Sequence, residues 1–274
     1  MSSRASLGEI FTRCSETGRA AFIPFLVAGD PDVTTSRACI DAAAKNGADI
    51  LEIGIPYSDP LADGPTIARA SERARQAGMT FEDALRLAAS STGRNPGVAM
   101  IAFTYYNPVY VRGIERTVSE LADAGLRGII VPDLPFAEAR PLREACVRHN
   151  LAATFLIAPT TPAQRAQQIA EHCSDFVYVV SRMGTTGAYA GVGEALPRRL
   201  AALRALTRKP LAVGFGVNSP AAAARIAAVA DGVIIGSALI DRMEAASSGE
   251  DAVAAVGTLC SQLATACRRV PISA

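Results

Sequence analysis

The feature that most constrains the fold is an alternation of short β-rich runs and longer helical segments along the 274 residues. The β-rich runs are apolar, as is typical of strands that are buried on both faces of a parallel sheet. Each is followed by an alanine- and arginine-rich segment with helical spacing, at intervals of roughly 30 residues. We expect strands at Ala21–Val27, Ile50–Ile53, Val98–Phe103, Gly128–Val131, Ala153–Ile157, Phe176–Val180, Leu211–Val213 and Gly232–Ile235.

Eight βα units without a spare strand predict an α/β fold, a closed (β/α)8 (TIM) barrel that takes up residues 1–274 as one domain. Two further helices are expected, one over Leu7–Thr17 before the first strand and one over Gly78–Arg94 after the second unit. An open, doubly wound sheet is the alternative. It is weakened because no GxGxxG motif follows the first strand.

The composition excludes several classes of function. The 27 Lys and Arg residues balance 26 Asp and Glu residues, so nucleic acid and anionic membranes are poor candidates as partners. The six cysteines form no CxxC pair, which predicts free buried thiols, a cytoplasmic location and no metal centre. The first residues are typical of an amphipathic helix rather than a signal peptide. No apolar run approaches the roughly 20 residues of a membrane span.

Glu52 is the first candidate catalytic residue, because active sites of such barrels lie at the C-terminal ends of the strands. Alternation along the second strand would direct Ile50, Glu52 and Gly54 into the barrel. A buried, unpaired carboxylate is costly and usually has a raised pKa and a catalytic role. An ion pair with an arginine is the structural alternative. Asp59 and Asp63 follow on the loop as possible turn formers, and Asp63 shares a site with Glu52 only if this loop folds back over the barrel mouth.

Tyr178 is the second candidate. By the same alternation its side chain would point inward near the barrel mouth, although a plain aromatic core residue fits the pattern equally well. The loop after this strand contains Gly184, Gly187, Gly191 and Gly193, and we expect it to act as a closing lid.

Glycines at the ends of the seventh and eighth strands predict a phosphate site. Gly214 and Gly216 follow one strand, and Gly236 precedes Ser237 at the expected start of a short helix. Backbone N–H groups at a helix N-terminus bind phosphate, and these two loops frequently do so in (β/α)8 barrels. Glycines that serve only tight turns are the alternative.

Histidine, lysine and metal chemistry are not favoured. His149 and His172 fall near the C-terminal ends of expected helices, and Lys45 and Lys209 precede strands, at the opposite end of the barrel. Proton transfer is therefore expected from carboxylates or tyrosine. These residues predict a phosphorylated substrate and acid–base catalysis, without naming the substrate.

The segment LEIGIPYSDPLADGPTI (Leu51–Ile67) resembles the signature segment of the tryptophan synthase α-subunit family. PFLVAGDP, VPDLP, SRMGTTG, GFGV and GSAL also fall where that family has corresponding segments, so the resemblance covers essentially the whole chain. It implies a lyase that cleaves indole-3-glycerol phosphate to indole and glyceraldehyde 3-phosphate by a retro-aldol reaction. Ala28 and Met183 depart from the family pattern and are expected to tune loop motion.

The resemblance also implies roles for individual residues. Glu52 is implied as the general acid–base at indole C3, and Asp63 as the acceptor of a hydrogen bond from the indole N–H. Tyr178 would line the pocket and help to place the substrate. The other implied roles are phosphate binding by Gly187, Gly216, Gly236 and Ser237, apolar walls from Phe25, Phe103, Ile130 and Phe215, loop closure through Thr186, and a partner interface at Pro56 and Asp59.

A partner follows from the same resemblance. The family pairs with a pyridoxal-phosphate-dependent β subunit in an α2β2 heterotetramer, which receives the indole and joins it to serine to make L-tryptophan. The cofactor belongs to that partner, so none is expected in this chain. Three alternatives stay open: a free-standing lyase that releases indole, a non-catalytic regulatory subunit, and another phosphosugar barrel enzyme.

Overall fold

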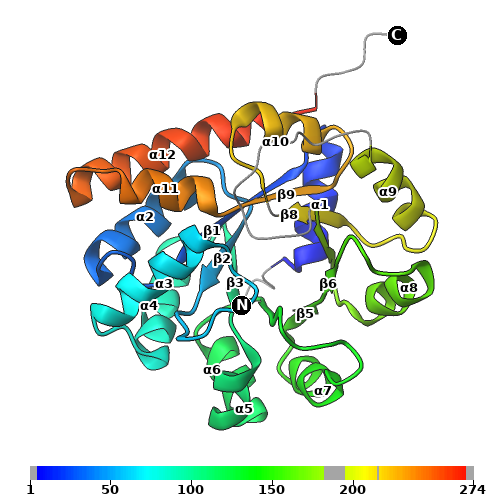
Figure 1. Cartoon of the computed structure of the whole chain (residues 1–274), viewed down its shortest axis with the longest axis horizontal. Helices are drawn as coiled ribbons and strands as arrows, with labels where there is room; N and C mark the ends of the chain where they lie inside the picture. The colour runs from blue at the N-terminus through cyan, green and yellow to red at the C-terminus, as the bar shows by residue number, and fades with distance from the viewer. Residues whose placement is uncertain (1–4, 182–194, 215, 270–274) are drawn as a thin grey trace.

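The fold is a closed barrel of parallel strands surrounded by helices (Figure 1). A computed structural model describes residues 5–181, 195–214 and 216–269. Its strands are β1 (Ala21–Val27), β2 (Ile50–Gly54), β3 (Ala99–Phe103), β4 (Gly128–Ile130), β5 (Ala152–Thr154), β6 (Leu156–Ile157), β7 (Val177–Val180), β8 (Leu211–Gly214) and β9 (Gly232–Ile235). They lie in the order β5-β4-β3-β2-β1-β9-β8-β7-β6.

The ring closes through one interrupted strand. β5 pairs with β4 and β6 pairs with β7, and only Phe155 separates these two short segments. Together they form the single strand predicted over Ala153–Ile157, so the nine segments correspond to eight strands. The predicted (β/α)8 barrel is thereby confirmed, and the open-sheet alternative is wrong because such a sheet would have two free edges.

The helices that pack outside the strands follow the predicted alternation. They are α1 (Leu7–Glu16), α2 (Val33–Lys45), α3 (Pro65–Gln76), α4 (Phe81–Arg94), α5 (Tyr106–Arg112), α6 (Ile114–Asp123), α7 (Arg140–Arg148), α8 (Ala163–His172), α9 (Ala195–Arg204), α10 (Pro220–Ala227), α11 (Ser237–Glu244) and α12 (Gly249–Ala266). None of the helices in the described ranges is long and apolar enough to cross a membrane.

Two helices follow β2, the helix of the second βα unit and the additional helix predicted after it. α3 starts at Pro65, a residue suited to the first helical position because it has no N–H to leave unpaired. The chain then turns at Gly78, whose φ of 87° favours glycine. A capping box between Thr80 and Asp83 starts α4 at Phe81, three residues later than expected. The short helix α5 was not predicted.

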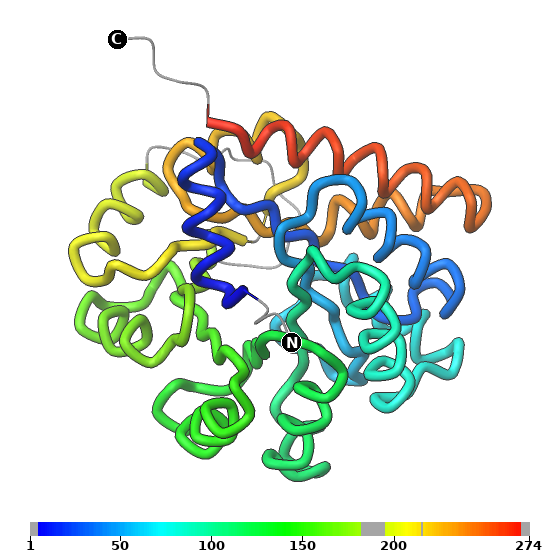
Figure 2. The backbone as a smooth tube through the Cα atoms, turned by 180° about the vertical axis from the view of Figure 1, so that it is seen from behind, coloured from blue at the N-terminus to red at the C-terminus, as the bar shows by residue number. Residues whose placement is uncertain are grey.

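α1 covers the N-terminal end of the barrel, and Figure 2 shows it in dark blue across the back of the ring. The Phe11 ring on α1 lies 5.2 Å from the Phe176 ring, just before β7 begins. The backbone N–H of Leu7 donates to Asp175 Oδ2 at 3.1 Å. With this end closed by the helix, the C-terminal ends of the strands form the mouth where a ligand can enter.

Candidate active site

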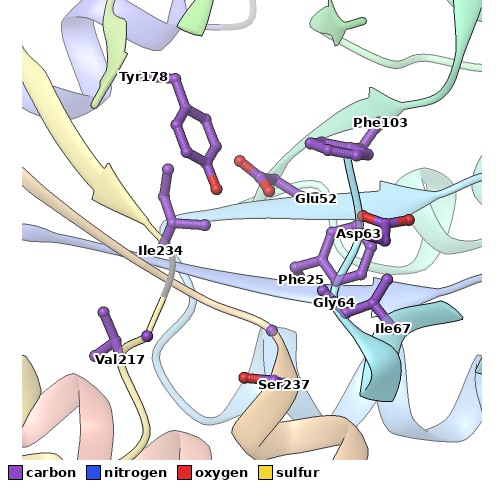
Figure 3. A pocket seen from close by; sticks show the side chains of 12 residues that line it. Phe25, Glu52, Asp63, Gly64, Ile67, Phe103, Tyr178, Val217, Ile234 and Ser237 are labelled. Atoms are coloured by element: carbon purple, nitrogen blue, oxygen red, sulfur yellow. The ribbon is translucent and has the colours of Figure 1, made fainter. Parts of the chain in front are cut away.

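A pocket lies at the C-terminal ends of the strands, and Figure 3 shows the side chains around it. It draws on β1, β2, β3, β7 and β9, on the loop after β2 and on the first turns of α3 and α11. Its lining residues are Phe25, Glu52, Asp63, Gly64, Ile67, Phe103, Tyr178, Gly216, Val217, Ile234, Gly236 and Ser237. Eight of the residues proposed from the sequence as catalytic, phosphate or indole contacts therefore line one pocket.

Glu52 points into the barrel from β2, as the alternation predicted. Its carboxyl group is 1% exposed, and its Oε1 atom has no hydrogen-bond partner among the described residues. Burial raises the pKa of Glu52 to about 8, because the apolar surroundings disfavour the charged form. No arginine of the described chain forms an ion pair with it, so the structural alternative of a buried ion pair is not supported.

Tyr178 reaches the same pocket from β7. Figure 3 shows its hydroxyl and the Glu52 carboxyl group pointing toward one another. Burial, and then the nearby charges of Glu52 and Asp63, hold the pKa of Tyr178 well above its usual value, so the phenol stays protonated. Gly214 makes room for this ring, because a Cβ atom there would lie 2.6 Å from Tyr178 Cζ. Gly214 itself does not line the pocket, unlike Gly216 and Gly236.

The loop after β2 folds back over the mouth and brings Asp63 beside Glu52. Burial raises the pKa of Asp63 to about 6, and a hydrogen bond from the Tyr105 hydroxyl acts in the opposite direction. The same hydroxyl accepts a hydrogen bond from the backbone N–H of Ala62 at 3.2 Å. The Tyr105 ring stacks on Tyr57 with the centroids 5.3 Å apart, which fixes both ends of the loop.

Tyr105 is a functional residue that the sequence reasoning missed. It lies two residues beyond Phe103, the last residue of β3, so the alternation that placed Phe103 in the pocket also directs Tyr105 inward. The side chain is 2% exposed. Extending the period of two past the end of the strand would have identified it.

The phosphate candidates lie together on one side of the pocket. Gly216 lines it with a φ of 77°, a conformation that favours glycine. Gly236 precedes α11 and its position offers no side-chain cap to the first N–H groups of the helix. The N-terminus of α11 at Ser237 therefore presents backbone donors that an anion can satisfy.

Aromatic and aliphatic side chains form the apolar walls. Phe25 and Phe103 line the pocket with their rings edge to face, 5.4 Å apart. Ile67, Val217 and Ile234 complete the wall and were not predicted. Ile130 is buried on β4 but is not among the lining residues, so its contact with a ligand stays a prediction. Thr186, Gly187, Phe215, Met183 and the remaining glycines of the expected lid lie outside the described residues.

The groups that were not expected to act in catalysis lie away from the mouth. His149 caps α7 and contacts Glu115, and Lys209 Nζ donates to backbone carbonyls at the end of α8. All six cysteines are free and buried, as predicted. Over the described ranges, no group of His, Cys, Asp and Glu side chains could hold a metal ion.

The fold and the pocket together define a (β/α)8 barrel in which the buried Glu52 and the half-buried Asp63 lie in one pocket with the N-terminus of α11. Comparison with known proteins makes this assignment more specific. The family model described as tryptophan synthase alpha chain matches residues 11–268. The chain belongs to the tryptophan synthase alpha chain family.

Individual relatives cover almost the full length. A tryptophan synthase alpha chain from Gloeobacter violaceus is 44% identical, with 99% of both chains covered. One from a Picosynechococcus species is 41% identical, over 94% of this chain and 97% of the relative. A solved structure of Mycobacterium tuberculosis tryptophan synthase superposes with a TM-score of 0.89 at 38% identity, over 97% of this chain and 100% of that chain.

Proposed function

We propose that this chain cleaves indole-3-glycerol phosphate to indole and glyceraldehyde 3-phosphate, and that it passes the indole to a β subunit for L-tryptophan synthesis. The observation that supports this most strongly is the convergence of Glu52, Asp63 and the N-terminus of α11 on one apolar pocket. A retro-aldol cleavage of this substrate needs an acid–base at carbon, an anion near the indole nitrogen and a phosphate anchor.

Glu52 is suited to both proton transfers. Since its pKa is raised to about 8, it is mainly protonated at neutral pH and can donate its proton to indole C3. The resulting carboxylate then takes the proton of the side-chain hydroxyl next to the bond that breaks. That hydroxyl carbon becomes the aldehyde, the electron pair of the carbon–carbon bond returns to the ring, and Glu52 is protonated again.

Asp63 supplies the negative charge that the intermediate needs. Protonation at C3 leaves a positive charge that is shared with the ring nitrogen. With a pKa of about 6, Asp63 is ionised at neutral pH, and its carboxylate can accept the N–H hydrogen bond and stabilise this cation. Tyr178 stays protonated and can donate to the substrate or to Glu52.

Substrate position follows from the two ends of the pocket. Phe25 and Phe103 would hold the indole ring, and Gly216, Gly236 and Ser237 would hold the phosphate. Gly187 and Thr186 belong to the same proposal through the family resemblance, with Thr186 bonding Asp63 when the loop closes.

A β subunit is the proposed partner, and the pyridoxal phosphate would belong to that partner. Pro56 and Asp59 lie on the loop after β2, and Leu61 on the same loop is 77% exposed. Tyr110 and Val111 on α5, after the neighbouring strand β3, are 65% and 75% exposed. Such grouped apolar exposure near the mouth supports a protein interface.

The test is indole release from indole-3-glycerol phosphate by wild type and Glu52→Gln, each with and without a β subunit. We expect slow wild-type turnover alone, strong activation by the partner, and no turnover by Glu52→Gln in either case. Glu72→Gln, which changes an exposed carboxylate on α3, is the matched control and should behave as wild type. Fast turnover without partner would favour the free-standing lyase. Tight binding without any turnover would favour the regulatory subunit and contradict the catalytic proposal.

A further inference from the structure

A cluster of ion pairs on the outside of the barrel joins α3 to α11. The carboxylate of Glu244, the last residue of α11, receives both Arg69 and Arg73 from successive turns of α3. Arg69 Nη2 lies 2.8 Å from Glu244 Oε2 and Arg69 Nε 3.1 Å from Oε1. Arg73 Nη1 lies 3.0 Å from the same Oε1. One carboxylate therefore holds two arginines of the neighbouring helix.

Two further contacts extend this cluster, one from Arg73 to the loop after β1 and one between the first turn of α3 and α11. Arg73 makes two further bonds to Asp30, of 2.8 and 3.0 Å, and Asp30 is only 1% exposed at the end of the β1 loop. At the N-terminal turn of α3, Thr66 Oγ1 donates to Asp241 Oδ1 of α11 at 3.0 Å. The two helices are thus tied at both ends of their contact.

These two helices carry opposite ends of the active-site pocket. Asp63 and Gly64 lead directly into α3, and Ile67 in its first turn lines the pocket. Ser237 begins α11 and lines the pocket from the phosphate side. Figure 3 shows Asp63, Gly64 and Ile67 on one side of the pocket and Ser237 below them.

We propose that Arg69, Glu244, Thr66 and Asp241 are positioning residues that set the distance between Asp63 and the phosphate-binding N-terminus of α11. The inference rests on the proposed function, since it uses the roles assigned there to Asp63 and Ser237. A substrate held by its phosphate at α11 meets Asp63 in the correct place only if the two helices keep their spacing. The cluster thereby converts phosphate binding into alignment of the indole nitrogen.

The physical basis is the use of binding energy from a remote group to orient the reacting centre. A misplacement of about 1 Å at a reacting group can reduce the rate by roughly 100-fold. Arg69 and Glu244 are 52% and 35% exposed, and exposed ion pairs contribute little to folding stability. Removing this pair should therefore change alignment more than stability. Arg73 is unsuitable for the test, because its loss would leave the buried carboxylate of Asp30 unpaired.

The experiment compares two substrates on wild type, Glu244→Ala and Thr66→Val, each saturated with the β subunit. One substrate is indole-3-glycerol phosphate and the other is the same molecule without its phosphate. We expect Glu244→Ala to lower kcat/KM for the phosphorylated substrate about ten-fold, and kcat/KM for the dephosphorylated one less than about two-fold. Thr66→Val, which removes one hydroxyl, should show the same pattern more weakly. Glu244→Asp should recover part of the loss.

The matched control is Arg75→Ala, which breaks the pair between Arg75 and Glu72 within α3 and leaves α11 untouched. It should leave the ratio between the two substrates unchanged. Equal losses for both substrates in Glu244→Ala, or no loss for either in both test variants, would overturn the inference while the proposed function stands. A wild type that does not turn over indole-3-glycerol phosphate would remove the proposed function, and the inference would fall with it.

Discussion

The pH profile of the lyase reaction should be set by Glu52 and Asp63 together, and Tyr105 should control its acid side. The proposed mechanism needs Asp63 ionised and Glu52 protonated, so kcat/KM should follow a bell. Activity should rise as the pH passes about 6 and fall as it passes about 8, according to the pKa values of the two groups. The informative perturbation is Tyr105→Phe, which removes the hydroxyl that donates to Asp63.

The size of the shift follows from the lost hydrogen bond. A hydrogen bond to a charged group contributes about 1.5–3 kcal/mol, and one pKa unit corresponds to about 1.4 kcal/mol. Because this bond favours the ionised form, its loss should raise the pKa of Asp63 and move the acid limb upward by about one to two pH units. The alkaline limb belongs to Glu52, whose pKa is raised by burial and not by Tyr105, so it should stay in place.

The assay is kcat/KM for indole release between pH 5 and pH 9, for wild type and Tyr105→Phe with a saturating β subunit. Below the optimum the variant should be slower by about ten- to hundred-fold, whereas the two proteins should approach each other on the alkaline side. Tyr106→Phe is the control, since the ring of this neighbouring tyrosine packs at a tilt of 43° against Tyr110 and its side chain bonds no catalytic group that the structure describes. An acid limb that does not move, or an equal loss at every pH, would refute the assignment of that limb to Asp63.

Three further predictions concern stability and assembly. Burial raises the pKa of Glu52 from 4.5 to about 8, so the contribution of this group to the free energy of unfolding is fully present below about pH 4.5 and is lost as the pH rises through 8. Glu52→Gln should therefore be more stable than wild type at pH 8 by about 1–3 kcal/mol in urea unfolding, and should lose this advantage at pH 4.5. Gly214→Ala should lower stability by about 1–3 kcal/mol because its Cβ would meet Tyr178, whereas Gly97→Ala, with open space around it, should not, as thermal unfolding would show. Leu61→Asp should weaken β-subunit binding at least about ten-fold in calorimetry, with activity of the isolated chain unchanged; unaltered affinity would place the interface elsewhere.

The parts of the site that lie on strands could be predicted from the sequence. The alternation of side chains is a local property with a period of two, so Glu52 and Tyr178 could be directed into the barrel from their own strands. Gly216 and Gly236 could be predicted from their place after two neighbouring strands, because the loops that follow such strands begin at the same mouth of the barrel.

The position of the loop after β2 could not be derived from strand periodicity, because residues distant in the chain fix it. Asp63 lies on a loop whose backbone N–H at Ala62 donates to Tyr105, a residue 43 positions away in the chain. The break at Phe155 and the short helix α5 likewise depend on packing rather than on local periodicity. The ion pairs of Glu244 join residues up to 175 positions apart, and no pattern in the sequence marks them.

In the proposed mechanism Glu52 and Asp63 need to differ in charge although they share one pocket. Their surroundings give the two carboxyl groups different pKa values. Burial acts on both, and it acts alone on Glu52, whose pKa rises to about 8. Asp63 is held by a phenol that donates to it, which limits the rise to about 6. Near neutral pH one group is therefore an acid and the other an anion, which is the arrangement that acid–base cleavage requires. Because the Tyr105 hydroxyl both bonds the loop and lowers the pKa of Asp63, the residue that positions the loop also widens the difference in pKa between the two carboxyl groups.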